Sequence, residues 1–596
     1  MTRSVESARR VARTAAVAAV STVPALLGAQ NGEVARLHAA SNGSYVSSTP
    51  RASTASAGAP ASISIEGGAR RVLVGATVPH TARVRDAAGA ERRDVAVKWT
   101  SSNPNIASVN QFGVLTAARP GSITVRAVAG GLAAERKYMV EVNPVKSLTL
   151  SITADQARTG DVVEVSATAF DANGLRVANV PFLYTFTAAV EDSAVGQMAP
   201  AALDQKGRFV AQNAGDYQII AVAPGLVAHR TVRVSNREVG ESARLVAKAA
   251  LGAPTTDVYA WRGRDGRQYA LACTGGSRGQ LVSFEVGDAT LKAIDTASVD
   301  GKSVTDCVVE EGGLGVAVRE VANGRSSLAL FDASDPRALK RLATFDEGIG
   351  AASGVALYKR HVYVVSDARR LDVVSVEDPA RPRRVGSVDL GAAGGNASDA
   401  ATDVSVSDGV AYVALGRNGV ALVDVGSGKF GGSPAKPVRV GAFRAPFAST
   451  HAAYGYRSRT GKWYVVTSED LGSVDAARGA PSGGLAQPGF ARIIDFSDPA
   501  HPEEVARYEV PEAGVQDLWV ENERLYVAAQ TGGLRVVDIS ADLKGNLYHQ
   551  GREVARLGAV DGSALPNVIA VHPIGGTVLV ADRNSGVWMV QLVPRP

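Results

Sequence analysis

Short apolar runs, in which every second residue is polar or small, recur along the chain. ITVRAV at 123–128 and YQIIAV at 217–222 alternate in this way, as strands with one buried face do. Gly, Asn, Asp and Pro separate the runs, and no long stretch after about residue 40 has the 3.6-residue period of a helix. The pattern predicts an all-β protein built from many short strands.

One stretch of this pattern is repeated. Residues 111–132 align without a gap onto residues 205–226, so that Gly113 matches Gly207 and Gly121 matches Gly215. A repeat near 90 residues is the size of one β-sandwich. The matched glycines are expected at turns, because glycine adopts positive φ at little cost. The repeat predicts two Ig-like sandwiches, at 61–143 and 146–235.

The first copy contains VKWTSSNPNIASVNQFGVLTAARPGSITVRA, with its W-x-S-S-x-P, A-S-V and G-x-L-T-A segments. This stretch resembles the bacterial Ig-like group 2 family. The second copy keeps only the later half of the pattern. The resemblance implies spacer and adhesion modules on exported bacterial proteins and no catalysis. We expect Trp99 in the core of the first sandwich.

A second phrase recurs after residue 243: an apolar run that ends in an acid and breaks at a turn. Examples are LALFDASDP, ALVDVGSG, RIIDFSDP and LRVVDIS, and the units are 43–71 residues apart. Units of this size with about four short strands predict a β-propeller. The phrase resembles the LVIVD repeat family. The terminal acids, such as Asp538, are expected to cap turns by accepting backbone hydrogen bonds.

Seven such units are recognised between residues 243 and 594, and the last has only three strands. Residues 243–251 (ARLVAKAAL) are expected to supply the missing strand. Closing the ring in this way removes the open edges of the sheet. The predicted fold is therefore two Ig-like β-sandwiches followed by a seven-bladed β-propeller closed by an N-terminal strand.

The first strand of each propeller unit lines the central channel, so the residues at its start are candidates for a site. Four carboxylates with a His and an Asn could hold a hard cation such as Ca²⁺ through oxygen ligands. They could also attract a cationic ligand or part of a partner. The alternative is that each Asp caps a turn or bonds an adjacent blade. The candidates are Asp257, Asp306, Gly354, Asp403, His451, Asp517 and Asn567.

Two other features are candidates for function or stability. The fifth unit carries an insertion at 468–490, and long loops on rigid scaffolds often bind partners. The two cysteines, Cys273 and Cys307, lie in consecutive units and could form a disulfide in an exported protein. The alternatives are a tolerated loop and two unpaired thiols.

The N-terminus suggests export. Residues 1–14 are basic and residues 15–29 are apolar and rich in small side chains, which is typical of a signal peptide cleaved after Ala29; the alternative is a short helix. Residues 30–60 are rich in Ser, Ala, Thr and Pro, as flexible linkers are. No later stretch has the length of apolar residues that a membrane span needs. Periplasmic, extracellular or cell-surface localisation is therefore expected.

Charge and motifs restrict the function further. The net charge is only +5 and the chain has no basic block with interleaved aromatics, which argues against nucleic-acid binding. It also lacks a nucleophile elbow and a phosphate-binding glycine loop. We expect a non-catalytic binding or adhesion protein for a protein or glycan partner. The alternatives are a metal-dependent propeller hydrolase or lactonase and a structural envelope component.

Overall fold

The computed structural model describes residues 59–67, 70–86, 92, 95–190, 200–238, 240–366, 369–391, 401–444, 448–470, 488–560 and 565–595. These residues form strands and one short 3₁₀ segment, Ala322–Gly324, and contain no α-helix, so the all-β fold class is confirmed. The chain divides into two compact units, Met1–Ser235 and Asn236–Pro596. The predicted signal peptide and nearly all of the predicted linker lie outside the described residues.

The first unit begins with a sandwich of two four-stranded sheets. Trp99 is partly buried and packs against the core cluster that contains Leu115 and Val125, as expected. The first sheet has the strand order β1 (Pro60–Gly67), β3 (Thr77–Asp86), β6 (Val114–Ala117) and β5 (Ala107–Val109). The second has the order β2 (Arg71–Leu73), β8 (Leu132–Glu141), β7 (Gly121–Ala129) and β4 (Lys98–Ser101).

A second sandwich repeats this topology strand for strand. One of its sheets has the order β9 (Ser147–Ile152), β11 (Val162–Phe170), β14 (Arg208–Ala211) and β13 (Ala201–Leu203). The other has the order β10 (Gln156–Arg158), β16 (Leu226–Ser235), β15 (Gly215–Ala223) and β12 (Leu183–Val190).

The glycines that matched in sequence have matching conformations. Gly113 and Gly207 have φ of 79° and 84°, and Gly121 and Gly215 have φ of 143° and 152°. A Cβ on Gly207 would also lie 2.1 Å from the Val165 carbonyl oxygen. Glycine is needed at these turns for both reasons.

The second unit consists, in its described residues, of seven sheets of four main strands, here called blades. Blades 1 to 3 contain β18 (Thr255–Arg262), β19 (Gln268–Thr274), β20 (Gln280–Val286), β21 (Leu291–Ser298); β22 (Val304–Val309), β23 (Leu314–Glu320), β24 (Ser326–Asp332), β25 (Lys340–Phe345); β26 (Ala352–Tyr358), β27 (His361–Ser366), β28 (Arg370–Ser375) and β29 (Arg383–Asp389).

The remaining blades follow in chain order. Blades 4 to 6 contain β30 (Asp403–Ser407), β31 (Val410–Ala414), β32 (Val420–Asp424), β33 (Val438–Phe443); β34 (Ser449–Arg457), β35 (Trp463–Asp470), β36 (Gly489–Asp495), β37 (Glu503–Val510); β38 (Asp517–Glu521), β39 (Arg524–Ala528), β40 (Leu534–Asp538) and β42 (Glu553–Leu557). Blade 7 contains β43 (Val568–Ile574), β44 (Thr577–Asp582), β45 (Gly586–Pro594) and β17 (Glu241–Ala249).

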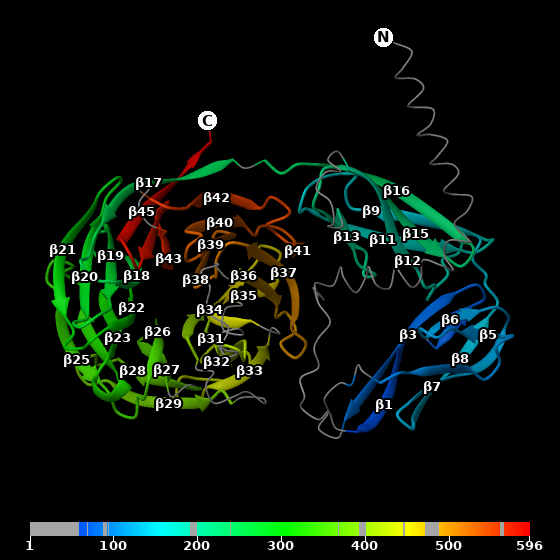
Figure 1. Cartoon of the computed structure of the whole chain (residues 1–596), viewed down its shortest axis with the longest axis horizontal. Helices are drawn as coiled ribbons and strands as arrows, with labels where there is room; N and C mark the ends of the chain where they lie inside the picture. The colour runs from blue at the N-terminus through cyan, green and yellow to red at the C-terminus, as the bar shows by residue number, and fades with distance from the viewer. Residues whose placement is uncertain are drawn as a thin grey trace, which may run out of the picture. The chain divides into compact units, whose positions relative to one another are not determined.

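The blades form a closed ring. The first strand of each blade contacts the first strand of the next, from β18 round to β43, and β43 contacts β18 again. Figure 1 shows this circle, in which the colour runs from green through yellow to red. The strand β17 pairs antiparallel with β45 at the outer edge of blade 7, so the expected closure by an N-terminal strand is confirmed.

Apolar clusters between neighbouring blades make up the core of this unit. One cluster joins blades 5 and 6 through Val466, Tyr508 and Val527, and another joins blades 6 and 7 around Trp588, which is fully buried. A short strand, β41 (Gly545–Asn546), leaves blade 6 and pairs in parallel with β37 of blade 5. Most of the predicted binding insertion lies outside the described residues, since 471–487 are not described.

Candidate functional site

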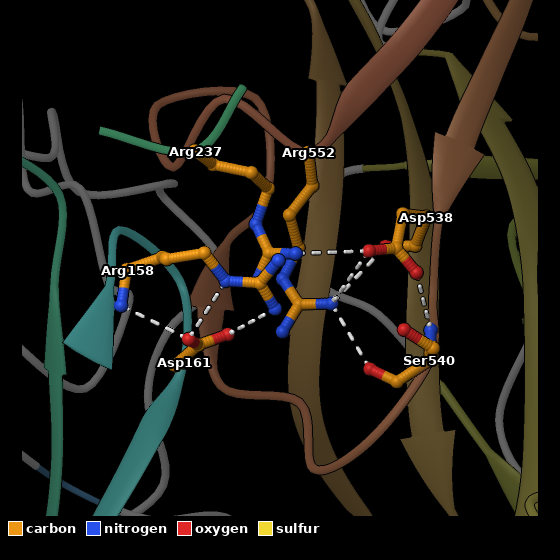
Figure 2. A network of polar contacts seen from close by, with 6 residues as sticks. All are labelled: Arg158, Asp161, Arg237, Asp538, Ser540 and Arg552. Atoms are coloured by element: carbon orange, nitrogen blue, oxygen red, sulfur yellow. Dashed lines mark hydrogen bonds and ion pairs between the residues drawn. The ribbon is translucent and has the colours of Figure 1, made fainter. Parts of the chain in front are cut away.

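The acids that end the third strands cap turns, as the sequence predicted. The carboxylate Oδ1 of Asp332, Asp495 and Asp538 each accepts a hydrogen bond from the backbone N–H two residues later, at 2.8, 2.8 and 2.9 Å. Figure 2 shows Asp538 between Ser540 and Arg552. Asp538 also forms an ion pair with Arg237 at 3.0 Å. These acids therefore stabilise turns of the propeller unit.

The strongest of these caps is Asp424, whose side chain is completely buried. Its two carboxylate oxygens accept hydrogen bonds from the backbone N–H groups of Gly426, Ser427, Phe430 and Gly432 at 2.7–3.0 Å. Burial by itself would raise the pKa of Asp424, but these donors outweigh it and hold the pKa at about 2.

Replacing this cap is expected to destabilise the propeller unit. Asp424→Ala removes the buried carboxylate that accepts four backbone N–H groups, which costs about 2–4 kcal/mol. The matched control is Asp332→Ala, which removes a cap with a single backbone bond and costs about 1 kcal/mol. Urea denaturation of the two variants measures the difference, and equal losses would contradict the prediction.

The first strands of blades 1, 2, 3, 5 and 7 have a register irregularity near their start. Hydroxyl groups at the start of three first strands fix how neighbouring blades align. Each hydroxyl belongs to the residue just before a candidate position. It donates a hydrogen bond to a backbone carbonyl of the next blade, two residues before the equivalent position there. The bonds join Thr256 Oγ1 to the Val304 oxygen (2.6 Å), Ser353 Oγ to the Ala401 oxygen (3.0 Å) and Thr402 Oγ1 to the Thr450 oxygen (3.0 Å).

This alignment brings four of the predicted residues into one ring and corrects two others. The equivalent position in blade 5 is Ala452 rather than His451, because the register shift between Thr450 and Ala452 makes His451 the extra residue. His451 instead contacts the Asp470 carboxylate through Nε2 at 2.7 Å. We call the four aligned aspartates the acid ring: Asp257, Asp306, Asp403 and Asp517.

In blade 7 the equivalent position is Ala570 rather than Asn567, because the register shifts between Val568 and Ala570. Asn567 lies before β43, where its backbone N–H donates to Asp582. In blade 3 the position is held by Gly354, as predicted. A Cβ on Gly354 would lie 2.6 Å from the Cα of Asp403, so the approach of blades 3 and 4 requires glycine there.

Three acid-ring carboxylates bond the backbone of the next blade. In each case Oδ2 accepts a hydrogen bond from the backbone N–H of the residue after the equivalent position in the next blade. One of the two carboxylate oxygens is therefore engaged by the backbone. The donors are Cys307 to Asp257 at 3.1 Å, Val355 to Asp306 at 2.6 Å and Val571 to Asp517 at 3.1 Å. The alternative interpretation of the sequence, that each Asp bonds an adjacent blade, therefore describes these three.

The acid ring holds its protons more tightly than ordinary carboxyls. Burial, followed by the charges of other ring members, raises the pKa of Asp257 and Asp403 to about 7 and that of Asp517 to about 8. The pKa of Asp306 is also well above its ordinary value, first through burial and then through Asp257, with which it shares a hydrogen bond. The ring therefore titrates near neutral pH.

This shift predicts that neutralising one member stabilises the fold. The native protein keeps a proton on Asp517 that the unfolded chain releases near pH 4, so this carboxyl lowers stability increasingly as pH rises from about 4 to about 8. Asp517→Asn, which retains an oxygen acceptor for Val571, is expected to gain on the order of 2 kcal/mol at pH 8 and much less at pH 5. Urea denaturation of both proteins at both pH values tests this, and a pH-independent difference would refute it.

The acid ring does not form a compact cation shell. In the described part of the chain, the three residues whose potential ligand atoms all lie within 4.8 Å of one another are Asp257, Cys273 and Cys307. The two sulfurs are joined in a disulfide, which links blade 1 to blade 2. Asp257 and Asp306 share a hydrogen bond, but no three ring carboxylates have oxygens that all lie within 4.8 Å of one another, so they do not converge as the oxygens around a Ca²⁺ ion do.

A row of aromatic side chains follows the acid ring, two residues later along each strand. Tyr259, Tyr454, Trp519 and His572 occupy these positions in blades 1, 5, 6 and 7, and we call them the aromatic row. The His572 ring centroid lies 4.0 Å from that of Trp519 and 4.4 Å from that of Tyr259. The Tyr454 and Trp519 centroids are 5.2 Å apart. Four separate strands therefore meet at the axis of the ring.

Comparison with known proteins gives two family matches. The model of the bacterial Ig-like domain (group 2) matches residues 61–138, and that of the LVIVD repeat matches 349–390, 398–443, 491–510 and 514–543. No curated protein matches the chain. Among the described residues, no helix is long and apolar enough to cross a membrane. The chain thus contains one stretch similar to group 2 bacterial Ig-like domains and, in its β-rich second unit, several stretches similar to LVIVD repeats.

Proposed function

We propose that the protein is an exported, non-catalytic binding protein in which Ig-like modules form a stalk and the propeller recognises a protein or glycan partner. Bacterial Ig-like domains and LVIVD repeats are typical of extracellular or cell-surface proteins. The observation that carries the proposal is the acid ring with its aromatic row, because it gathers ionisable and aromatic groups from separate strands at one place on a rigid scaffold.

The hydrogen bonds of the acid ring favour binding over catalysis. Backbone amides of neighbouring blades hold one oxygen of three carboxylates, which orients the other oxygen and limits its movement. A metal-dependent hydrolase would need several ligands to converge on one ion, and no three ring carboxylates lie close enough together for that.

The experiment presents the intact protein to glycan and peptide arrays. The variant Asp257→Asn/Asp517→Asn is expected to lose the signals, whereas Asp495→Asn, which changes a turn cap, retains them. Signals that survive in the ring variant would show that the binding surface lies outside the acid ring. Hydrolysis of array ligands that depends on added metal would favour the hydrolase, and an array without any signal would favour a structural role.

A further inference from the structure

His572 is a buried polar side chain without a hydrogen-bond partner. It is 7 % exposed, and neither ring nitrogen makes a hydrogen bond, although the Pro573 carbonyl lies close enough to raise its pKa slightly. Burial lowers the pKa of His572 to about 3, so the ring is a neutral imidazole in the physiological range. Such a group costs free energy unless something bonds it, which makes it unusual in a core.

The surroundings of His572 lead directly to the acid ring. The His572 ring packs at a tilt of 56° against Tyr259 and of 47° against Trp519, which lie two residues beyond Asp257 and Asp517 on their strands. Burial and the charges of Tyr454, Asp257 and Asp306 raise the pKa of Tyr259, so the tyrosine lies in the field of the acids. The acid ring and the aromatic row are therefore adjacent layers.

The acid ring and three members of the aromatic row retain some solvent exposure, whereas His572 is buried. All four ring aspartates, together with Tyr259, Tyr454 and Trp519, are half-buried rather than fully enclosed, although they lie on the innermost strands. Trp588 on β45, by contrast, is fully buried. The aromatic and acidic groups thus face accessible space along the axis of the ring.

Three kinds of group in these layers favour the same ligand. Carboxylates attract a positive charge, and the faces of Trp and Tyr attract organic cations through their quadrupoles. A neutral imidazole nitrogen accepts a hydrogen bond from an N–H group. Because no three ring carboxylates converge on one point, they suit a cation that is larger than a metal ion and carries its own N–H donors.

We propose that the acid ring and the aromatic row bind the ammonium group of an alkylamine, with His572 accepting one of its N–H hydrogens. This inference rests on the binding function proposed above and names the chemistry of the ligand. The ammonium group can belong to a free amine or to a lysine side chain of a partner, and both present the same donors and charge.

Binding should depend on pH. The groups that face the site are the four ring carboxyls, the hydroxyls of Tyr259 and Tyr454, the imidazole of His572 and, beyond Tyr454, Glu521 and Asp408. Asp257 and Asp403, with a pKa of about 7, and Asp517, with a pKa of about 8, titrate between pH 6 and pH 9. Burial raises the pKa of Tyr259 and Tyr454 and lowers that of His572, so these groups stay neutral there. An alkylammonium remains protonated over this range, so its affinity should rise about tenfold or more from pH 6 to pH 9.

The test uses the intact protein with n-butylammonium as the probe and saturation-transfer NMR of its methyl protons as the readout. Binding is expected to weaken at least tenfold in Asp517→Asn and in Trp519→Leu, and to remain unchanged in Asp495→Asn. His572→Phe preserves the ring stacking and removes the nitrogens. It is expected to weaken n-butylammonium and to leave tetramethylammonium, which has no N–H, unaffected.

Other probes distinguish the source of the amine and the competing explanations. A lysine peptide that binds more tightly than n-butylammonium, and loses binding when acetylated, assigns the site to a protein partner; the reverse order assigns it to a free amine. Equal binding of n-pentanol, equal binding at pH 6 and pH 9, or displacement by micromolar Ca²⁺ would overturn the inference. Array signals that persist in Asp517→Asn while n-butylammonium fails to bind would reject this ligand and leave the binding function standing.

Discussion

Leu245→Asp/Val246→Asp is expected to open the ring of blades. These two side chains of β17 pack on opposite faces of the strand, Leu245 against the cluster of blades 6 and 7 and Val246 against that of blades 7 and 1. Placing a carboxylate in each apolar contact costs on the order of 3–5 kcal/mol in total and detaches the strand. Without β17 the paired edge of β45 becomes exposed, and the propeller unit loses its closure.

Calorimetry of the full chain measures this loss, because the two units can unfold in separate transitions. The transition of the propeller unit should shift down sharply, while that of the Ig-like unit stays in place. Arg244→Ser/Lys248→Ser is the matched control, since both side chains lie on the same strand and are exposed. A propeller transition that is equally stable in the two variants would show that β17 contributes little to closure.

The closure of the ring was predictable because it follows from repetition. Seven recurrences of one phrase, with three strands in the last unit, leave one strand to be found, and ARLVAKAAL is apolar enough to supply it. The repeat at 94 residues located the turns of both sandwiches for the same reason. In each case many residues carry the same signal. The repeat therefore remains recognisable where the third strand ends in Ser375 or Gln591 instead of an acid.

The candidate site was predictable only in part, because it depends on register. The equivalence of the four aspartates is visible in the similar sequences TTDVYA, VTDCVV and VQDLWV. A register shift precedes Asp257 and Asp306, whereas the strands of Asp403 and Asp517 pair without one. The sequence pattern assigned His451 and Asn567 to the ring, but the register shifts put the equivalent positions one residue later in blade 5, at Ala452, and three residues later in blade 7, at Ala570. A shift of one residue turns a side chain to the other face of its strand.

The aromatic row was missed altogether, although a sequence signal existed. Tyr259, Tyr454, Trp519 and His572 share a position only after the register has been corrected, because His451 and Asn567 would have placed Ala453 and Ile569 there. The burial of His572 without a hydrogen-bond partner is a property of packing, which the sequence pattern does not contain. The sequence pattern therefore identified the acid ring but not the aromatic row beside it.

Removing the disulfide between Cys273 and Cys307 is expected to destabilise the propeller unit by roughly 3–4 kcal/mol, because the cross-link restricts the unfolded chain. The cysteines are 34 residues apart, and both are buried, so Cys273→Ala/Cys307→Ala exposes no surface in the native state. Cys273 lies opposite Asp257 across β18 and β19, so the cross-link also fixes blade 1 against blade 2 beside the acid ring. Urea denaturation gives the loss, and a reductant should lower the midpoint of the wild-type chain but not that of the variant. A variant as stable as the oxidised protein would show that the two blades are held by packing alone.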